Sequence, residues 1–343
     1  EALAQDDILM IQDVQGKLYL TTELMPAILI HENHAATALE IMSRYAVDPH
    51  WLIYLPPTMS PCETSVLEGY LEHPLEAFAY YRKSGIQTVI CEKKHMGSRA
   101  VIVLCHTAET AKQRFGVDDG TRGVLYTRTG RRFFEDPEME SAVLGRLDRV
   151  LTENHFWEDF STEWVCLDTE LMPWSEKAQT LLEKQYAPVG RSGRDGLLAA
   201  VEALEQVCRR PNHRSQVTAE TSGQNVDPQE LLARYREKKE ALEKYTEAYR
   251  EYCWRVGSVE DLRIAPFHLL ACEGRVFSEE SHVWHMEKLK QYCGGDAVFM
   301  ATDYIQVNPS DRESVRRGVD WWLERTGSGG EGMVVKPETF VAR

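Results

Sequence analysis

The sequence predicts an α+β protein with antiparallel sheets and one long stretch that is purely helical. Short apolar runs typical of strands recur between Gln87 and Lys336, and they do not alternate regularly with helical patterns. Between Glu176 and Val256 these runs disappear, and helix-forming residues with paired charges replace them. Irregularly spaced strands favour antiparallel sheets over a doubly wound parallel sheet.

Composition limits the class of protein. The chain has 343 residues, is 43% hydrophobic and can bury a substantial core. We expect a cytoplasmic protein that does not enter a membrane, since no apolar run approaches about 20 residues and the first residues do not resemble a signal peptide. The eight cysteines are scattered singly, which argues against a zinc ribbon or a disulfide framework. A formal net charge of −15 opposes indiscriminate binding to phosphate backbones, so a nucleic acid would need a local basic surface.

The first part of the chain predicts short strands and helices in turn. Two strands around Gln15-Gly16 are expected between Asp7 and Thr22. Apolar residues at helical spacing predict a helix from His34 to Ala46. Prolines exclude a regular helix between Trp51 and Ser65, and another helix is expected between Leu67 and Gly85.

Strands dominate the rest of the predicted core. A strand from Gln87 to Glu92 and another from Ala100 to Cys105 flank a polar segment, which we expect to be a hairpin-like excursion between two buried runs. Further strands are expected at residues 123–129, 163–168, 268–272, 298–301 and 332–336.

The helical stretch has its own start signal and packing face. Asp227 is expected to cap a helix that has Pro228 in its first turn. Its apolar face is formed by Leu232, Tyr235, Leu242, Tyr245, Tyr249 and Tyr252, and the tyrosines favour packing over base stacking. On the opposite face, a Glu240–Lys244 ion pair would add about 0.3 kcal/mol. The preceding loop holds a basic cluster of Arg209, Arg210, His213 and Arg214, for which an RNA-phosphate contact and an ordinary solvated loop are equally consistent.

The segment from Lys94 to Arg99 (KHMGSR) has the residues of a nucleophilic lysine site. A lysine amine attacks only when neutral, and an ordinary lysine at pH 7 is neutral in roughly one molecule in 2,500. A partly desolvated cleft with Arg99 and a bound metal nearby would lower the pKa of such a lysine. Gly97 allows a tight turn and close approach to a ligand, and Arg99 offers a planar fork for ribose or phosphate oxygens.

Strand parity distinguishes the two adjacent lysines. Side chains alternate along a strand, so Lys93 and Lys94 should point to opposite faces, and the spacing to Gly97 selects Lys94. Taken alone, Lys94, Asp168 and Glu170 are more typical of solvated residues at strand ends and edges than of catalytic residues. The other motif-like segments, which occur in a fixed order along the chain, favour the catalytic interpretation.

Four segments together resemble an enzyme family. They are KHMGSR (94–99), YTRTGRRFF (126–134), LDTELMPW (167–174) and GEGMVVKP (330–337). Their order and spacing resemble the K-x-x-G-x-R, D-x-E and E-G-x-x-x-K motifs of the covalent nucleotidyltransferases, which include ATP- and NAD-dependent DNA ligases, RNA ligases and mRNA capping enzymes.

Longer segments are similar to the ligase domain of the bacterial Pnkp family, the polynucleotide kinase-phosphatases of RNA repair. They are WLIYLPPTMSPCETS, EAFAYYRKSG, EKKHMGSRAV, CLDTELMPWS and IAPFHLLA. The resemblance runs from about Thr22 to the end. It implies a nucleotidyltransferase core of antiparallel sheets flanked by helices, unrelated to the ATP-grasp fold. It also implies four parts: a lead-in at 1–21, the first part of the core at 22–175, an inserted helical module at 176–256, and the second part of the core at 257–343.

The resemblance implies three-step ligation that uses ATP and Mg²⁺ or Mn²⁺. Lys94 would form lysyl-AMP, AMP would pass to an RNA 5′-phosphate, and a 3′-hydroxyl would displace it. The matching positions are Glu92 near the adenine amino group, Arg99 at ribose and phosphate, Glu170 and Glu331 at the metal with Asp168 as a further candidate, and Lys336 at the ATP phosphates. The implied partners are RNA ends, kinase and phosphatase domains upstream in the same polypeptide, and an RNA 2′-O-methyltransferase.

Two features depart from the family pattern. Relatives carry a further K-x-K or K-x-R motif after E-G-x-x-x-K, and the sequence reaches Arg343 without it, so the last motif is expected to be missing. If that lysine is absent, adenylylation would be impaired even with an intact fold. Many relatives also have an aromatic residue three positions before the aspartate of D-x-E. Here that position is Val165, and Trp164 falls on the opposite face by parity, so the adenine cover is left open.

Other interpretations stay open at this point. One is a related nucleotidyltransferase, such as a DNA ligase or a capping guanylyltransferase. Another is a catalytically weak scaffold of an RNA-repair complex. His282 and His285 have helix-compatible spacing for two metal ligands, but no third ligand is evident nearby, so surface or capping histidines are expected.

Overall fold

The computed structural model describes residues 15–21, 27–53, 63–173, 187–209 and 227–340. The chain divides into two compact units, one formed by residues 1–172 and 257–343 and the other by residues 173–256. Several expected features lie outside the described residues: the strand expected before Gln15, most of the proline-rich segment, and Arg210, His213 and Arg214 of the basic cluster.

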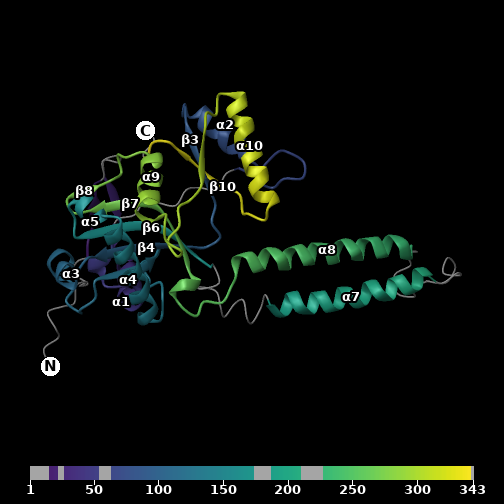
Figure 1. The fold of residues 1–343 in the computed structure, drawn as a ribbon, viewed down its shortest axis with the longest axis horizontal. Helices are drawn as coiled ribbons and strands as arrows, with labels where there is room; N and C mark the ends of the chain where they lie inside the picture. Colours follow the sequence, from purple (N-terminus) through teal and green to yellow (C-terminus); the bar gives the residue numbers. More distant parts are fainter. Residues whose placement is uncertain (1–14, 22–26, 54–62, 174–186, 210–226, 341–343) are drawn as a thin grey trace. The chain divides into compact units, whose positions relative to one another are not determined.

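The first unit combines helices with antiparallel sheets, which confirms the predicted α+β class (Figure 1). A five-stranded sheet has the order β5 (Gly123–Thr127), β4 (Ser98–Cys105), β6 (Trp164–Met172), β7 (Arg263–Cys272) and β8 (Arg275–Val276). A three-stranded sheet has the order β10 (Met333–Pro337), β3 (Val89–Lys93) and β9 (Tyr304–Val307). A third, two-stranded sheet pairs β1 (Leu18–Leu20) with β2 (Ile28–Ile30).

The segment that links β3 to β4 is not a hairpin-like excursion, so that expectation is wrong. β3 pairs with β9 and β10, whereas β4 pairs with β5 and β6. Residues 94–97 therefore carry the chain from one sheet to the other. Two apolar runs around a polar turn have the same sequence pattern in both arrangements, because partners far along the chain decide the pairing.

Each sheet has its own hydrophobic core. On the five-stranded sheet, buried β4 and β5 residues such as Val101, Val103 and Val124 pack with Trp51 and Val117. The helices of this part are α1 (Glu32–Tyr45), α3 (Ala108–Phe115), α4 (Pro137–Glu153), α5 (Phe156–Phe160) and α9 (His282–Cys293), and α9 packs on β7. The three-stranded sheet packs against α2 (Pro74–Lys83) and α10 (Arg312–Gly327), with Phe78 and Val89 fully or nearly fully buried.

Most expected elements are present with shifted ends. The helix expected at 34–46 is α1, and α2 occupies only the second half of the segment 67–85. β1 is paired with β2. The strand expected at 298–301 is wrong: Phe299 makes a single bridge to Ile264, because the Asp296 carboxylate accepts the backbone N–H groups of Val298 and Phe299.

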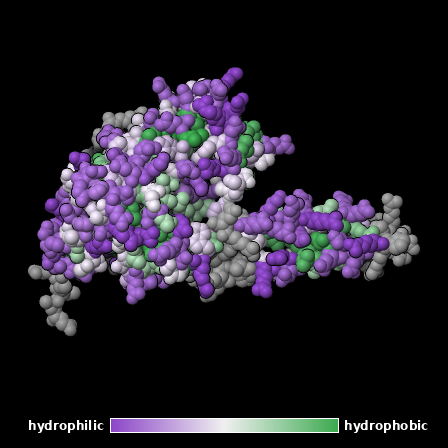
Figure 2. Space-filling model, in the orientation of Figure 1, coloured by the Kyte–Doolittle hydropathy of each residue, from purple (hydrophilic) through white to green (hydrophobic). Residues whose placement is uncertain are grey.

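The second unit contains two helices that pack on each other, α7 (Ala187–Arg209) and α8 (Pro228–Tyr252). Asp227 caps α8 by accepting the Gln229 N–H at 3.0 Å, with Pro228 in the first turn, which confirms the predicted start. Val201 and Leu232 are buried. Figure 2 shows hydrophobic surface along the middle of this pair with hydrophilic side chains around it. The predicted Glu240–Lys244 ion pair is present at 3.1 Å.

No helix in the described parts of the chain is long and apolar enough to cross a membrane.

Close packing at Gly318 gives a stability prediction. A Cβ at this position of α10 would lie 2.8 Å from Phe78 Cζ and 3.0 Å from Val307 Cγ2. Gly318→Ala should lower the free energy of unfolding by about 1–3 kcal/mol through overpacking. The matched control is Gly327→Ala in the same helix, where a Cβ meets no atom within 4 Å, and it should be neutral or stabilising by up to about 1 kcal/mol. Urea denaturation measures both, and equal stability of the two variants would show that the packing argument is wrong.

Candidate active site

Strand register brings Glu92 of β3 and Lys336 of β10 together. Glu92 is opposite Val334, so Lys336, two residues further along, lies on the same face of the sheet. The Lys336 Nζ donates to Glu92 Oε2 at 2.7 Å, and both side chains are buried. The other carboxylate oxygen of Glu92 is buried with no hydrogen-bond partner among the described residues. Glu92 Oε1 is therefore a buried acceptor that is available to a ligand of the site.

Lys94 follows β3 directly and is held against the E-G motif. Its backbone N–H donates to the Gly332 carbonyl at 3.1 Å, and its ammonium group forms an ion pair with the Glu331 carboxylate. Gly332 has a φ of +118°, and a Cβ there would lie 2.9 Å from Trp322 Nε1. This position therefore needs glycine, and the requirement fixes Glu331 beside Lys94.

Gly97 lets the linking segment press against β6. A Cβ on Gly97 would lie 2.4 Å from the Leu171 carbonyl oxygen. The Glu170 carboxylate accepts the backbone N–H of Gly97. Burial, together with the nearby negative charge of Glu331, raises the pKa of Glu170 to about 7. Glu170 and Glu331, 161 positions apart in the numbering, thus form a pair of carboxylates that a cation would stabilise.

Arg99 of β4 is aimed by Asp168 of β6. Arg99 Nε donates to Asp168 Oδ1 at 2.8 Å and Nη2 donates to Oδ2 at 2.5 Å, which is a two-point pair. Burial raises the pKa of Asp168, and Arg99 opposes that effect. Because Arg99 engages both oxygens, Asp168 orients the arginine in this structure, and Glu170 and Glu331 are two carboxylates of the site that lie near enough for their charges to interact.

His95 anchors the segment on its other side. Its Nε2 lies 2.9 Å from the hydroxyl oxygen of Thr302, and burial, followed by the charge of Lys93, lowers its pKa to about 4. The Lys93 backbone N–H donates to the Asp303 carbonyl at 2.8 Å. The beginning of the segment between the sheets is thereby tied to residues 302–303, which precede β9.

Two residues of the site were not singled out from the sequence, Phe267 and His268 of β7. The Lys336 ammonium lies 4.9 Å from the Phe267 ring, so this aromatic side chain borders the Glu92–Lys336 pair. The sequence signal that could have identified Phe267 is its position in the family-like segment IAPFHLLA.

The two residues considered for the adenine cover lie elsewhere. Trp164 lies about 20 Å along β6 from Glu170, by strand rise, and its indole N–H donates to Glu273 at 3.0 Å, whereas Val165 is fully buried. Neither borders the site.

The expectation of surface or capping histidines at 282 and 285 is wrong. Both are buried because this face of α9 packs on β7, and Ser281 is the residue that caps the helix. Among the residues the structure describes, no three His, Cys, Asp or Glu side chains are grouped so that they could hold a metal.

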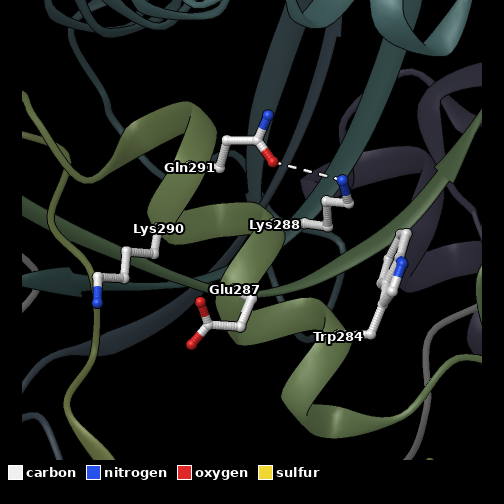
Figure 3. A pocket seen from close by; sticks show the side chains of 5 residues that line it. All are labelled: Trp284, Glu287, Lys288, Lys290 and Gln291. Atoms are coloured by element: carbon white, nitrogen blue, oxygen red, sulfur yellow. Dashed lines mark hydrogen bonds between the residues drawn. The ribbon is translucent and has the colours of Figure 1, made fainter.

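A hollow on α9 is separate from these residues. It is lined by Trp284, Glu287, Lys288, Lys290 and Gln291 (Figure 3). Lys288 donates to Gln291 at 3.3 Å, while Lys290 points away from the others. Its side chains do not converge on one point, and none of the predicted site residues lines it.

The chain matches one family model and resembles solved structures. The model describes the PNKP adenylyltransferase domain, ligase domain, and it matches residues 37–343. Two solved structures, "Structure of Pnkp1/Rnl/Hen1 complex" and "Structure of the Pnkp1/Rnl/Hen1 RNA repair complex", share 20% identity with it, with TM-scores of 0.54 and 0.52. Each match covers 82% of this chain and 71% of the other. No curated protein matches it.

These two structures share the fold of this chain, and the family model covers most of the chain, including every residue of the site. The chain therefore belongs to the family of PNKP adenylyltransferase domains, the ligase domain of that family.

Proposed function

We propose that this chain is an ATP-dependent RNA ligase domain that acts through a lysyl-AMP intermediate on Lys94. The observation that carries the proposal is the meeting of Lys94, Arg99, Glu170 and Glu331, which come from three separate sequence motifs, at the segment between the two sheets. Their chemistry fits transfer of a nucleotidyl group, since an amine nucleophile, a forked cation and paired carboxylates surround one point.

The proposed reaction has three steps. The neutral amine of Lys94 attacks the α-phosphorus of ATP, a P–N bond forms, and the P–O bond to pyrophosphate breaks. The proton leaves Lys94 beforehand, and Glu331 is an acceptor in contact with the ammonium group. The RNA 5′-phosphate then displaces the lysine to give an adenylylated end. Finally, the 3′-hydroxyl attacks that end, the new phosphodiester forms, and AMP leaves.

The nucleotide contacts follow from the buried groups. The unpaired oxygen of Glu92 is an acceptor suited to an amino group, as adenine presents, and Phe267 offers a ring face beside it. Arg99 supplies a fork for ribose or phosphate oxygens. Lys336 donates a hydrogen bond to Glu92 in this structure. For Lys336 to contact the phosphates of a bound nucleotide, this hydrogen bond has to break.

The residues present fit a Mg²⁺ or Mn²⁺ ion. Glu170 and Glu331 supply hard carboxylate oxygens, and burial, followed by the negative charge of Glu331, raises the pKa of Glu170. Two carboxylates leave most positions of an octahedral ion to phosphate oxygens and water, which is usual where the metal comes with a nucleotide. When bound, the ion would neutralise charge on the phosphates. The contact of Lys94 with Glu331 places an ammonium group where that cation would compete for the carboxylate.

The proposal extends to the biological setting. RNA with 5′-phosphate and 3′-hydroxyl ends is the proposed substrate, and kinase and phosphatase domains upstream and an RNA 2′-O-methyltransferase are the proposed partners. One of the two similar structures is that of an RNA repair complex, which supports this choice over DNA ligation or capping. The described cysteines are free thiols, which supports a cytoplasmic setting.

The nucleophile assignment predicts a clear difference between adjacent lysines. With ATP labelled at the α-phosphate and a divalent metal, the wild type should acquire label that survives denaturation. Lys94→Ala should abolish this label, and Lys93→Ala should keep it within about threefold, because Lys93 only flanks the site. Loss of label in Lys93→Ala alone would contradict the assignment. A chain extended beyond Arg343 is the control for weak labelling.

Substrate identity is checked in the same assay. Label should come from ATP and not from GTP, because the Glu92 acceptor suits an amino group and not the oxygen of guanine. NAD presents the same adenine as ATP, and label from NAD would favour an NAD-dependent ligase. The labelled protein should release AMP to nicked RNA faster than to nicked DNA. Transfer of label from GTP would favour a capping-type enzyme.

The carboxylate pair predicts opposite effects of Glu170→Gln on metal binding and on stability. The pKa of Glu170 is about 7 in the folded protein, above its ordinary value, so the free energy of unfolding loses this contribution as pH rises from about 4.5 through 7. Without metal, Glu170→Gln should therefore raise the Tm at pH 8 by about 2–4 °C and have little effect at pH 4.

Metal binding should follow the ionised carboxylate. In the wild type, the Mn²⁺ affinity should fall by about tenfold per pH unit below pH 7, whereas Glu170→Gln should bind weakly at every pH. Glu109→Gln, an exposed glutamate of α3, is the control for loss of one negative charge. Calorimetry measures the affinity, and an unchanged Mn²⁺ affinity in Glu170→Gln would remove this residue from the metal site.

A further inference from the structure

Three buried histidines stand behind the Arg99–Asp168 pair. His268 of β7 is the register partner of Asp168, and its Nδ1 lies 4.0 Å from Asp168 Oδ2. Its Nε2 lies 3.0 Å from Nδ1 of His282 on α9. His285, one turn along α9, has its ring centroid 5.2 Å from that of His268. None of these three histidines belongs to the K-x-x-G-x-R, D-x-E or E-G-x-x-x-K motifs.

The proton position on His285 is fixed by its partners. Its Nδ1 accepts the backbone N–H of Leu269 at 3.3 Å, and its Nε2 lies 3.1 Å from the Phe277 carbonyl oxygen. An N–H group can only donate and a carbonyl can only accept, so the ring is neutral with its proton on Nε2. His285 is thus fully used by the backbone and takes no part in the contact between His268 and His282.

The proton position on His268 follows from a choice between two arrangements. The 3.0 Å contact with His282 holds one proton. If His268 donated it, Nδ1 would be a bare acceptor facing the Asp168 carboxylate inside the protein, which is repulsive and leaves Nδ1 as a buried acceptor without a donor. If His282 donates it, the His268 proton is on Nδ1 and points at Asp168. In the second arrangement, Nε2 of His268 is paired with His282. Its Nδ1–H, which has no hydrogen-bond partner among the described residues, lies 4.0 Å from Asp168 Oδ2, too far for a hydrogen bond but favourably oriented toward the carboxylate charge.

The surroundings keep the rings neutral and exclude water. Burial, followed by the positive charge of Lys336, lowers the pKa of His268 well below its usual range and that of His282 to about 2. Phe340 covers the cluster, with its ring centroid 4.7 Å from that of His268. The His282 backbone N–H donates to the Glu338 carbonyl at 2.9 Å, which ties the residues after β10 to the start of α9. The charged groups that face the cluster are Lys336, Arg99 and Asp168.

We propose that His268 is a positioning residue: its Nδ1–H faces Asp168, its Nε2 accepts from His282, and it thereby holds the carboxylate that aims Arg99 at the nucleotide. The inference rests on the proposed function for its effect on catalysis, whereas its proton arrangement stands on the geometry alone. Arg99 contacts the nucleotide in this scheme and His268 does not. The effect should therefore appear in nucleotide affinity more than in turnover.

Nuclear magnetic resonance tests the arrangement without ATP. In protein labelled with ¹⁵N-histidine, long-range ¹H–¹⁵N spectra distinguish a ring protonated on Nδ1 from one protonated on Nε2. His268 should be neutral with the proton on Nδ1, and His285 should be neutral with the proton on Nε2 as an internal reference. Loss of one set of signals in His268→Asn assigns the ring. A proton on Nε2 of His268 in the wild type would overturn the inference.

Kinetics of lysyl-AMP formation test the consequence. The amide nitrogen of Asn occupies the place of Nδ1 and can donate to Asp168, whereas Leu cannot. His268→Leu should raise the KM for ATP by about tenfold or more with kcat within about threefold, and His268→Asn should restore KM to within about threefold of wild type. His285→Leu, a buried histidine in the same cluster, controls for general loss of packing and should leave KM within about threefold.

The magnetic-resonance and kinetic experiments together distinguish failure of the proposed function from failure of the positioning role. If the wild type forms no lysyl-AMP, the proposed function fails, and the Arg99 Nε–H resonance replaces KM as the readout: it should shift in His268→Leu and not in His285→Leu. An unchanged KM, or an unchanged Arg99 resonance, in a folded His268→Leu variant would overturn the positioning role. If His268→Leu does not fold, the proton position in the wild type decides the inference.

Discussion

The site depends on one constraint: the chain passes from one sheet to another within residues 94–97. Gly97 presses so closely on β6 that a Cβ would lie 2.4 Å from the Leu171 carbonyl oxygen. This approach brings the start of β4, with Arg99, beside the end of β6, with Asp168 and Glu170. On the other side, the Lys94 backbone N–H bonded to Gly332 holds the E-G motif in place. If β3 and β4 formed a hairpin, the same residues would be present, but the fold would not bring them together at one site.

Charge pairing explains how so many ionisable groups are tolerated at this junction. Glu92 is matched by Lys336, Asp168 by Arg99 and Glu331 by Lys94, so burial does not leave these charges isolated. Among the acidic residues of this site that the structure describes, two groups are left over. They are the second oxygen of Glu92 and the carboxylate of Glu170, whose pKa burial and Glu331 raise to about 7. Unmatched groups in an otherwise paired interior are the ones that a nucleotide and a cation would satisfy.

Sequence reasoning reached the fold class and most strands because apolar runs and helical spacing are local signals. It reached the site residues through motif spacing, and the structure brings Glu92, Lys94, Arg99, Glu170, Glu331 and Lys336 to one junction of the two sheets. It failed where tertiary partners or side-chain contacts decide the outcome. The crossing after β3 depends on strand partners far along the chain, and the burial of His282 and His285 depends on packing against β7. The strand expected at 298–301 is absent for a local reason, because the Asp296 carboxylate accepts the N–H groups of Val298 and Phe299. Phe267 and His268 were missed because an aromatic and a histidine within an apolar run have no distinct pattern.

The central claim is that this junction forms a covalent bond to adenylate, and a crystal structure of the protein after reaction with ATP and Mg²⁺ tests it most directly. The account predicts continuous density from Lys94 Nζ to the phosphorus of AMP, with the adenine amino group beside Glu92 and the ribose or phosphate oxygens at Arg99. Adenylate attached to another residue, or nucleotide bound only in a place such as the hollow on α9, would contradict it.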